Sequence, residues 1–445
     1  MGIDTTLRDH LRGGPCHIAW LKLKKGQKPD VTGFVRIHDI LTSMYHAVGP
    51  NVGQDRPYMF SGAQLYTEFI KGSRAHFASG GLVYIIVADD PVNVPPEKKE
   101  TQDTRTASSP IVPYPSESKY TFDARGMSID GADSEQVDIR RLMRSRHIRP
   151  LLFQFLADIM KENEHVDDHC TLIFDYKAAQ RPIIIGSNIP AGATVQHALG
   201  EADIGMFYWA RFYKDFDVIL QTTDTDFMPI FAAYYRLMTT EEFTPEQRDK
   251  KFYWVYDKDN TVDAKCLIRE TLKFLNIPLR AFIALCILGG TDFYKKKRIL
   301  HHFGIKSIIQ YVQSTAKQWR TFGDETNHPI DNRYCLDSLL CIAYSRYLNN
   351  EPLVYREPLD DDDDKTKKRK AGEPDIKTTK TVNWTTYRGA LKCPKSFCPP
   401  TDAEIRSALD RILWNVNYWN SPFLPIAAAS AASVEAKKQK ITVSE

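Results

Sequence analysis

The stretch GLVYIIVADD, residues 81–90, combines an unbroken apolar run with two carboxylates at its end. Such a run is typical of a strand that is buried on both faces, as in a parallel sheet. VTGFVRIHDILTSMYHAV, residues 31–48, has the same design: a β-rich run ends at Asp39 and passes into a helix. FDVILQTTDTD, residues 216–226, is a third instance. The sequence therefore predicts an α/β fold with a parallel sheet flanked by helices.

Acidic residues stand where each of these strands is expected to end. Ligands of such sheets bind beyond the carboxyl ends of the strands, so Asp39, Asp89 and the pair Asp224 and Asp226 are predicted to face one crevice. In an extended segment Asp224 and Asp226 would project together, and their repulsion is relieved by a divalent cation such as Mg²⁺ or Mn²⁺. The alternative is that Asp224 caps a helix starting near Met228 while Asp226 is solvated.

A second acidic pair opens the predicted helix in GEADIGMFYWARF, residues 200–212. Residues i and i+2 of a helix point about 200° apart, so Glu201 and Asp203 can reach one site only if Glu201 precedes the first full turn. Acids at a helix start also complement the helix dipole, which is the alternative role. The buried stripe of this helix is predicted to comprise Ile204, Phe207, Tyr208 and Phe212.

The last acid of interest lies in LCILGGTDFYKKKR, residues 285–298. Gly289 and Gly290 can end an apolar helix and leave Asp292 just outside it. A carboxylate with cations one turn away suits the binding of a phosphodiester beside a metal, and a neutralised surface pair is the alternative. The cations that follow Asp292 are Lys295, Lys296, Lys297 and Arg298.

Residues 101–150 are predicted to form a lid or arch. Residues 101–131 are rich in Pro, Gly, Ser and Asp and are too long for an ordinary connection. They lead into VDIRRLMRSRHIRP, residues 137–150, in which Arg140, Arg144 and His147 share one helical face. These residues form either a nucleic-acid contact or a solvated face. Formal charge is only +3, so a nucleic-acid surface must come from such local clusters.

The C-terminal part changes composition. Residues 351–385 contain DDDDD (360–364) and KTKKRK (365–370), which predicts a charged linker with a possible nuclear-localisation signal. Residues 386–425 include EIRSALDRILWNVNYW, whose apolar spacing predicts a helix that packs back on the body. Residues 426–445 are predicted to be a disordered tail. No apolar run approaches the ~18 residues of a membrane helix, and the eight cysteines form no disulfide framework, which favours reduced thiols.

These motifs together resemble the flap endonuclease family of structure-specific 5′-nucleases. The resemblance rests on the MGI start, IHDILTSMYHAV, the acid after VYIIVA, GEAD, TTDTDF and LCILGGTDF, and it spans roughly residues 1–315. It implies a PIN-like nuclease core over residues 1–350, with a helical arch and a helix-two-turn-helix-like element over residues 275–315. It also implies Mg²⁺-dependent hydrolysis of DNA at single-strand/duplex junctions, in replication, repair or recombination in the nucleus.

The resemblance also assigns site residues. Two Mg²⁺ ions, or Mn²⁺ in their place, would be held by seven acids, namely Asp39, Asp89, Glu201, Asp203, Asp224, Asp226 and Asp292. Gly2 corresponds to the N-terminal glycine beside the DNA junction. Lys99 and Arg105 correspond to the family's basic pair. Beside the resemblance, the basic clusters of the chain predict further nucleic-acid contacts: Lys98, Arg140, Arg141, Arg144, Lys295, Lys296 and Arg298.

The chain departs from the family pattern at several points. Asp90 follows Asp89, so either carboxylate could be the ligand, and RILHHFGIKSII, residues 298–309, lacks the family's glycines for duplex binding. No clear sliding-clamp motif is present in the tail. Two alternatives to a DNA nuclease therefore stay open: a 5′→3′ exoribonuclease of the same superfamily, and a catalytically silent DNA-binding scaffold. Such divergence also fits a viral protein that acts in an infected cell.

Overall fold

The computed structural model describes part of the chain in two compact units. The described residues are 29–31, 33–39, 59–60, 72–89, 112, 114, 120–123, 126–129, 137–138, 141, 145, 170–176, 181–191, 195–198, 201–257, 260–290, 299–300, 302–323, 329–347, 388 and 399–420. The first unit comprises Met1–Phe274 with Asn417–Glu445, and the second comprises Leu275–Val416. The predicted core over residues 1–350, the linker and the tail stay predictions.

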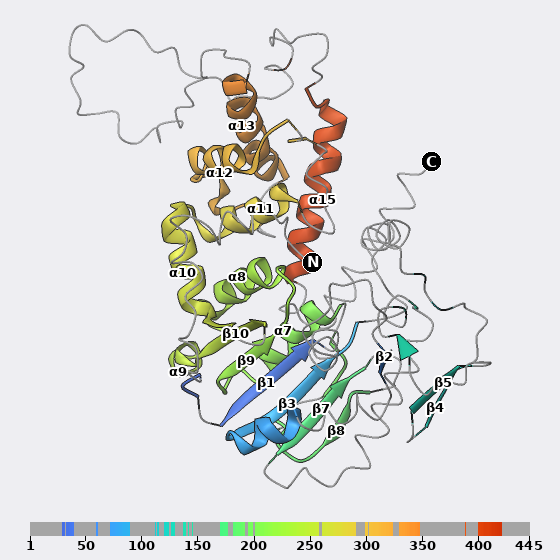
Figure 1. Ribbon diagram of the computed structural model, residues 1–445. Coiled ribbons are helices and arrows are strands. Elements are labelled where there is room, and N and C mark those ends of the chain that lie inside the picture. Colours follow the sequence, from blue (N-terminus) through green and yellow to red (C-terminus); the bar gives the residue numbers. More distant parts are fainter. Residues whose placement is uncertain are drawn as a thin grey trace, which may run out of the picture. The chain divides into compact units, whose positions relative to one another are not determined.

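The first unit is built on a seven-stranded sheet of order β11-β10-β9-β1-β3-β7-β8 (Figure 1). Five neighbouring strands are parallel: β1 (Phe34–Asp39), β3 (Gly81–Val87), β7 (Thr171–Asp175), β9 (Val218–Gln221) and β10 (Phe252–Asp257). The two edge strands, β8 (Ile183–Ile185) and β11 (Asn260–Asp263), are antiparallel. The predicted α/β fold with a mostly parallel sheet is confirmed, and β1, β3 and β9 lie in the three predicted runs.

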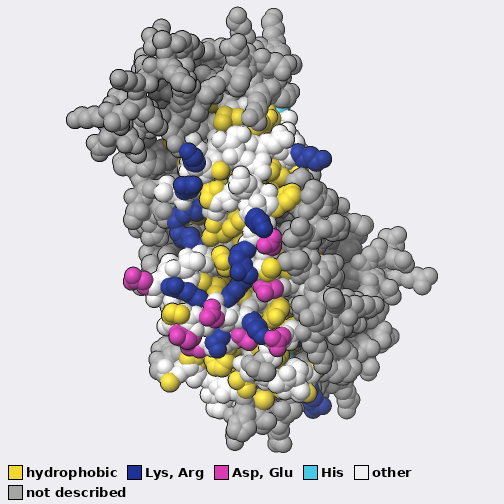
Figure 2. Space-filling model, turned by 90° about the vertical axis from the view of Figure 1, so that its left-hand side faces the viewer, with side chains coloured by type: hydrophobic (Ala, Val, Ile, Leu, Met, Phe, Trp, Pro, Cys, Tyr) yellow, Lys and Arg dark blue, Asp and Glu magenta, His cyan; other side chains and the backbone are white. Residues whose placement is uncertain are grey.

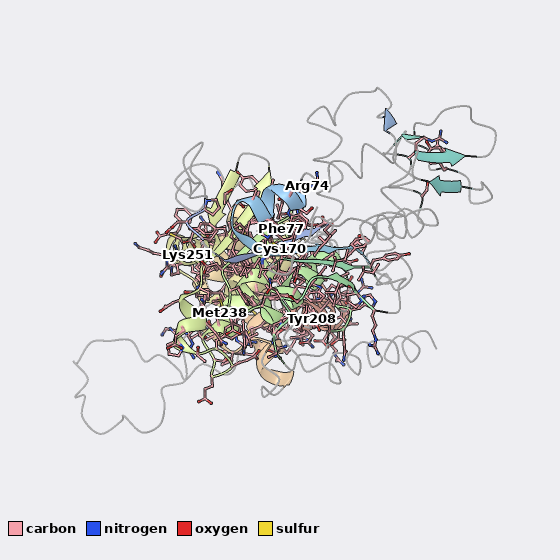
Figure 3. All side chains as sticks on the ribbon, turned by 90° about the horizontal axis from the view of Figure 1, so that it is seen from below. Arg74, Phe77, Cys170, Tyr208, Met238 and Lys251 are labelled. Carbon is pink, nitrogen blue, oxygen red and sulfur yellow. The ribbon has the colours of Figure 1, made fainter. Side chains whose placement is uncertain are left out.

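Helices cover both faces of this sheet, which explains the unbroken apolar runs of β3 and β9. One face carries α7 (Ala202–Phe212) and α8 (Phe227–Met238), and the helical residues 72–78 cover the other. Viewed from below in Figure 3, Arg74 and Phe77 lie on one side of the sheet and Tyr208 and Met238 lie on the opposite side.

An aromatic cluster fills the space between the sheet and the helix pair. Phe227 of α8 stacks on Trp254 of β10 with ring centroids 4.3 Å apart, and Phe207 of α7 stacks on Phe252 at 6.2 Å. The predicted buried stripe on α7 is confirmed for Ile204 and Phe207 and is wrong for Tyr208 and Phe212, which are only half-buried. Residues outside the stripe are also fully buried, namely Met206, Trp209 and Ala210. The helix packs on the sheet and on α8, so most of its circumference is covered.

On the opposite face of the sheet, the imidazole of His76 is a buried polar side chain. Its ring packs against Phe34 and Tyr84, with ring centroids 4.8 and 5.3 Å away. The ring occupies the space that a larger residue at position 81 would need, since a Cβ atom added to Gly81 would lie 2.0 Å from His76 Cε1. Burial, together with the charge of Arg36, lowers the pKa of His76 to about 3. Burial raises the pKa of Tyr84 to about 12. His76 is therefore neutral at physiological pH.

The remaining elements of the first unit are short. β2 (Met59–Phe60) pairs with β6 (Val137–Asp138), and β4 (Tyr120–Asp123) forms an antiparallel hairpin with β5 (Gly126–Ile129). The first two residues of the stretch in which we expected an arginine-rich helix are therefore strand, because they pair with β2. Helices α9 (Pro245–Asp249) and α10 (Ala264–Leu275) flank β10 and β11 in the sequence.

The second unit is helical. It contains α11 (Leu279–Gly289), α12 (Ile305–Ser314), the 3-10 turn η2 (Gln318–Arg320), α13 (Pro329–Tyr347) and the first part of α15 (Asp402–Asn420). As predicted, α11 ends at Gly289, and Gly290 follows with φ 115°. The predicted C-terminal helix is confirmed as α15, in which Ile405, Leu409 and Ile412 are buried. No single helix among the described residues is long and apolar enough to cross a membrane.

Candidate carboxylate site

Asp39 and Asp89 lie at the carboxyl ends of two adjacent parallel strands. Asp39 pairs in register with Val87, and Asp89 follows Val87 by two residues. Because side chains alternate along a strand and adjacent strands are ~4.8 Å apart, both carboxylates belong to the same face of the sheet edge. This face carries α7, since a Cβ atom at Gly205 would lie 2.8 Å from Val87 Cγ1. The predicted convergence of these two strand ends is present in the fold.

A hydrogen bond joins the start of α7 to the end of β3. The Ala202 amide donates to Asp89 Oδ1 with an N···O distance of 3.0 Å. Glu201 is the N-cap residue with extended backbone (φ −85°, ψ 170°), so it precedes the first turn as predicted. Its amide donates to the Tyr418 hydroxyl at 3.4 Å. Asp89 therefore brings the backbone that carries Glu201 and Asp203 to this sheet edge.

Both acids of the GEAD segment are buried. Glu201 is 3% exposed and Asp203 is 8% exposed. Asp203 Oδ1 accepts a hydrogen bond from the Ile204 amide at 2.9 Å. A buried carboxylate is costly unless hydrogen bonds or cations compensate its charge. The dipole role and the metal-ligand role therefore both stay open for these two side chains.

Asp224 and Asp226 form a turn between β9 and α8. The Asp226 amide donates to Asp224 Oδ1 at 3.0 Å, and Asp226 has helical backbone (φ −63°) as the N-cap residue of α8. The premise that the two residues project together from an extended segment is therefore wrong, because the chain turns at Thr225 and Asp226. The alternative is wrong in two respects as well: Asp226, not Asp224, occupies the N-cap position, and Asp226 is only 2% exposed.

A further buried acid, Asp175, was missing from the sequence prediction. It ends β7 in register with Val87 and is fully buried. Its Oδ1 lies 2.6 Å from His197 Nδ1, and its Oδ2 accepts from the Ala198 amide at 3.0 Å and from Trp209 Nε1 at 2.7 Å. TLIFD, residues 171–175, has the same apolar-run-then-acid design as the other strands, which was the available signal.

Arg141 is the only predicted nucleic-acid contact within the described part of the chain, and it makes internal contacts. Its Nε donates to the Val112 carbonyl at 3.0 Å, and its guanidinium carbon lies 4.1 Å from the centre of the Tyr114 ring. The other predicted contacts lie outside the described residues: Gly2, Lys98, Lys99, Arg105, Arg140, Arg144, Lys295, Lys296 and Arg298. Asp292 and Asp90 also lie outside them, so the choice between Asp89 and Asp90 as ligand stays open.

Helix α10 adds basic residues that the sequence reasoning overlooked. Lys265, Arg269 and Lys273 recur every four residues and so share one side of the helix. Lys265 Nζ donates to the carbonyls of Arg248 and Lys250, whereas Arg269 and Lys273 are exposed. Figure 2 shows Lys and Arg side chains interspersed with Asp and Glu side chains over the lower part of the face that it presents.

The fit to a metal ion is partial. Carboxylate oxygens are the donors that Mg²⁺ and Mn²⁺ prefer, and the acids gather near one sheet edge. However, no three Asp, Glu, His or Cys side chains of the described residues are arranged as a ready metal-binding group. The described acids alone therefore form no preassembled metal centre.

No protein-family model and no curated protein matches this chain.

Proposed function

We propose that the chain is a metal-dependent, structure-specific 5′-nuclease of PIN-like fold that hydrolyses DNA phosphodiester bonds. The observation that carries this proposal is the hydrogen bond from Ala202 to Asp89, which joins the acids of the GEAD segment to the edge where β1 and β3 end. A nuclease of this class needs carboxylates from several elements close together, and the acids at two strand ends and one helix start near this sheet edge support the proposal.

Each acid has a role in this proposal. The metal ligands would be Asp39, Asp89, Glu201, Asp203, Asp224, Asp226 and Asp292. Two bound Mg²⁺ ions would supply Lewis-acid activation of water and of the scissile phosphate. The protein's own contribution is burial: Glu201, Asp203 and Asp226 lie in surroundings with little water, where charge interacts strongly. Because the described acids form no preassembled centre, binding requires side chains to re-orient or Asp292 to join them.

The proposed substrate is DNA with a single-strand/duplex junction. Basic residues of the 101–150 segment and of residues 295–298 would neutralise its phosphates, together with Arg269 and Lys273 of α10. Arg141 would have to leave its contact with Tyr114 to take part. Action in the nucleus, in replication or repair, belongs to the same proposal.

A catalytically silent nucleic-acid-binding scaffold is the second candidate. One observation favours it: the described residues hold no group of three possible metal ligands. A scaffold would keep the fold and bind nucleic acid without cutting it.

The experiment is cleavage of 5′-labelled single-flap, nicked and single-stranded DNA, and of the matching RNA, in Mg²⁺ or Mn²⁺. We expect cutting near the flap junction that Asp224→Asn abolishes and that Asp249→Asn, an exposed acid of α9, leaves intact. Preference for RNA would favour the exoribonuclease alternative. Binding without cleavage of any substrate would contradict the nuclease proposal and support the scaffold.

A further inference from the structure

The last turn of α15 contacts the start of α7, although the two are far apart in the sequence. Residues Asn417–Glu445 belong to the first unit, as α7 does. Trp419 in this turn is fully buried, whereas Tyr418 is partly exposed. The Tyr418 hydroxyl accepts a hydrogen bond from the Glu201 amide across 217 positions of sequence, with an N···O distance of 3.4 Å. The end of the C-terminal helix thus lies against the GEAD segment of the candidate site.

Three side chains accept hydrogen bonds from the first amides of α7. The first N–H groups of a helix have no partner within it. Glu201 is the N-cap residue, but its side chain makes no capping hydrogen bond. Asp89 accepts from the Ala202 amide, and Asp203 accepts from the amide of the residue that follows it. The Tyr418 hydroxyl, which accepts from the Glu201 amide, is the acceptor of these three that brings no negative charge.

The contact with Tyr418 helps to fix the backbone of Glu201. The Glu201 amide donates to Tyr418, and the Glu201 carbonyl accepts from the Gly205 amide at 2.8 Å, which is the first hydrogen bond of the helix. Between these two groups the backbone is extended (φ −85°, ψ 170°). Because the peptide groups on both sides of Glu201 are held, these contacts set the direction in which its side chain leaves the backbone.

We propose that Tyr418 is a positioning residue of the candidate site, which holds the acids of the GEAD segment in place, so that the C-terminal helix is part of the site. This inference rests on the proposed function, because that function assigns metal binding to Glu201 and Asp203. A metal site needs its ligands held to within a fraction of an ångström. A tyrosine hydroxyl suits this role, since it accepts from an amide without adding charge to an acidic site.

The alternative is that the contact only fixes the end of α15. Tyr418→Phe keeps the ring and removes the hydroxyl. Tyr213→Phe is the matched control, because Tyr213 lies at the other end of α7, about 16 Å along the helix. Its hydroxyl donates to the Asn188 carbonyl at 3.0 Å. The control therefore removes a hydrogen bond from the same helix without touching the acids.

The first measurement is amide hydrogen exchange by NMR on the metal-free full chain in EDTA. In Tyr418→Phe we expect the amides of Glu201, Ala202 and Ile204 to exchange about three- to tenfold faster, since the turn loosens as one unit. The amides of α8 serve as the reference for the stability of the whole unit. Tyr213→Phe should leave the three amides unchanged. Faster exchange of the Glu201 amide alone, or of none of the three, would overturn the inference.

The second measurement is Mn²⁺ affinity, followed by electron paramagnetic resonance. The 3.4 Å contact is long for a hydrogen bond, so we expect Tyr418→Phe to weaken Mn²⁺ binding severalfold and Tyr213→Phe to leave it unchanged. If Tyr418 acts through Glu201, it has no further effect in the Glu201→Gln background. Wild-type affinity in Tyr418→Phe, or losses that simply add in the double variant, would overturn the inference.

The two measurements separate this inference from the proposed function. A wild type that binds no Mn²⁺, but in which Tyr418→Phe loosens all three amides, would support the positioning role and contradict the nuclease proposal. Mn²⁺ binding and metal-dependent cleavage that are unchanged in Tyr418→Phe, with unchanged amide exchange, would do the reverse.

Discussion

Protonation of His76 should control how the first unit responds to acid. The side chain is 2% exposed, and burial beside Arg36 lowers its pKa from the ordinary 6.5 to about 3. In the unfolded chain the imidazole takes up a proton near pH 6.5, whereas in the folded chain it stays neutral down to about pH 3. The unfolded state therefore binds more protons in this window, so the free energy of unfolding falls as pH falls from about 6.5 to about 3.

The size of this loss follows from the two pKa values. Each unit of pH between them costs about 1.4 kcal/mol. Between pH 7 and pH 5 His76 should lower the free energy of unfolding by about 2 kcal/mol, and by pH 4 the loss should reach about 3 kcal/mol. Carboxylates also titrate in this range, so the wild-type curve alone does not isolate the histidine.

A matched variant isolates the histidine. In His76→Phe a benzene ring, which does not titrate, takes the place of the imidazole that packs on Phe34 and Tyr84. Urea unfolding at pH 7 and pH 5, followed by the fluorescence of the buried Trp209 and Trp254, gives both free energies. On going from pH 7 to pH 5, we expect the free energy of unfolding of the wild type to fall by about 2 kcal/mol more than that of the variant. Parallel pH dependences for the two proteins would refute the reasoning.

Three further perturbations test the packing. Gly290→Ala places a side chain at φ 115° and should destabilise the second unit by about 1–3 kcal/mol, measured by urea unfolding, whereas a shift below 0.5 kcal/mol would contradict the strain argument. Trp209→Phe removes one hydrogen bond from the buried Asp175 and should cost about 1–3 kcal/mol; an unchanged urea midpoint would show that this contact is unimportant. Phe227→Ala empties the space against Trp254 and should cost about 3–5 kcal/mol, and a loss under 1 kcal/mol would mean that the cluster is loosely packed.

The strands with long apolar runs could be predicted from the sequence because burial on both faces leaves a simple pattern. β1 ends at Asp39, β3 ends two residues before Asp89, and α11 ends at the predicted glycine. β7 and β10 were not predicted, although TLIFD and FYWVYD are shorter examples of the same pattern, an apolar run followed by an acid. Short runs resemble fragments of buried helices, so periodicity alone separates them poorly.

The features that the sequence does not reveal depend on contacts between distant residues. His197 contacts Asp175, which lies 22 residues earlier, and no local pattern links the two. Asp226 is buried because the chain turns after β9, and an extended reading of TTDTDF cannot anticipate that turn. Likewise α7 is covered by both the sheet and α8, which a single-helix pattern cannot show.

Mn²⁺ binding tests the central claim most directly, since the proposed nuclease depends on these carboxylates holding metal. Electron paramagnetic resonance would measure free Mn²⁺ during titration of the wild type, Asp224→Asn and the control Asp249→Asn. The account predicts saturable binding that Asp224→Asn weakens by tenfold or more and that Asp249→Asn leaves unchanged. Equal Mn²⁺ binding in all three proteins, or no saturable binding in any of them, would contradict it.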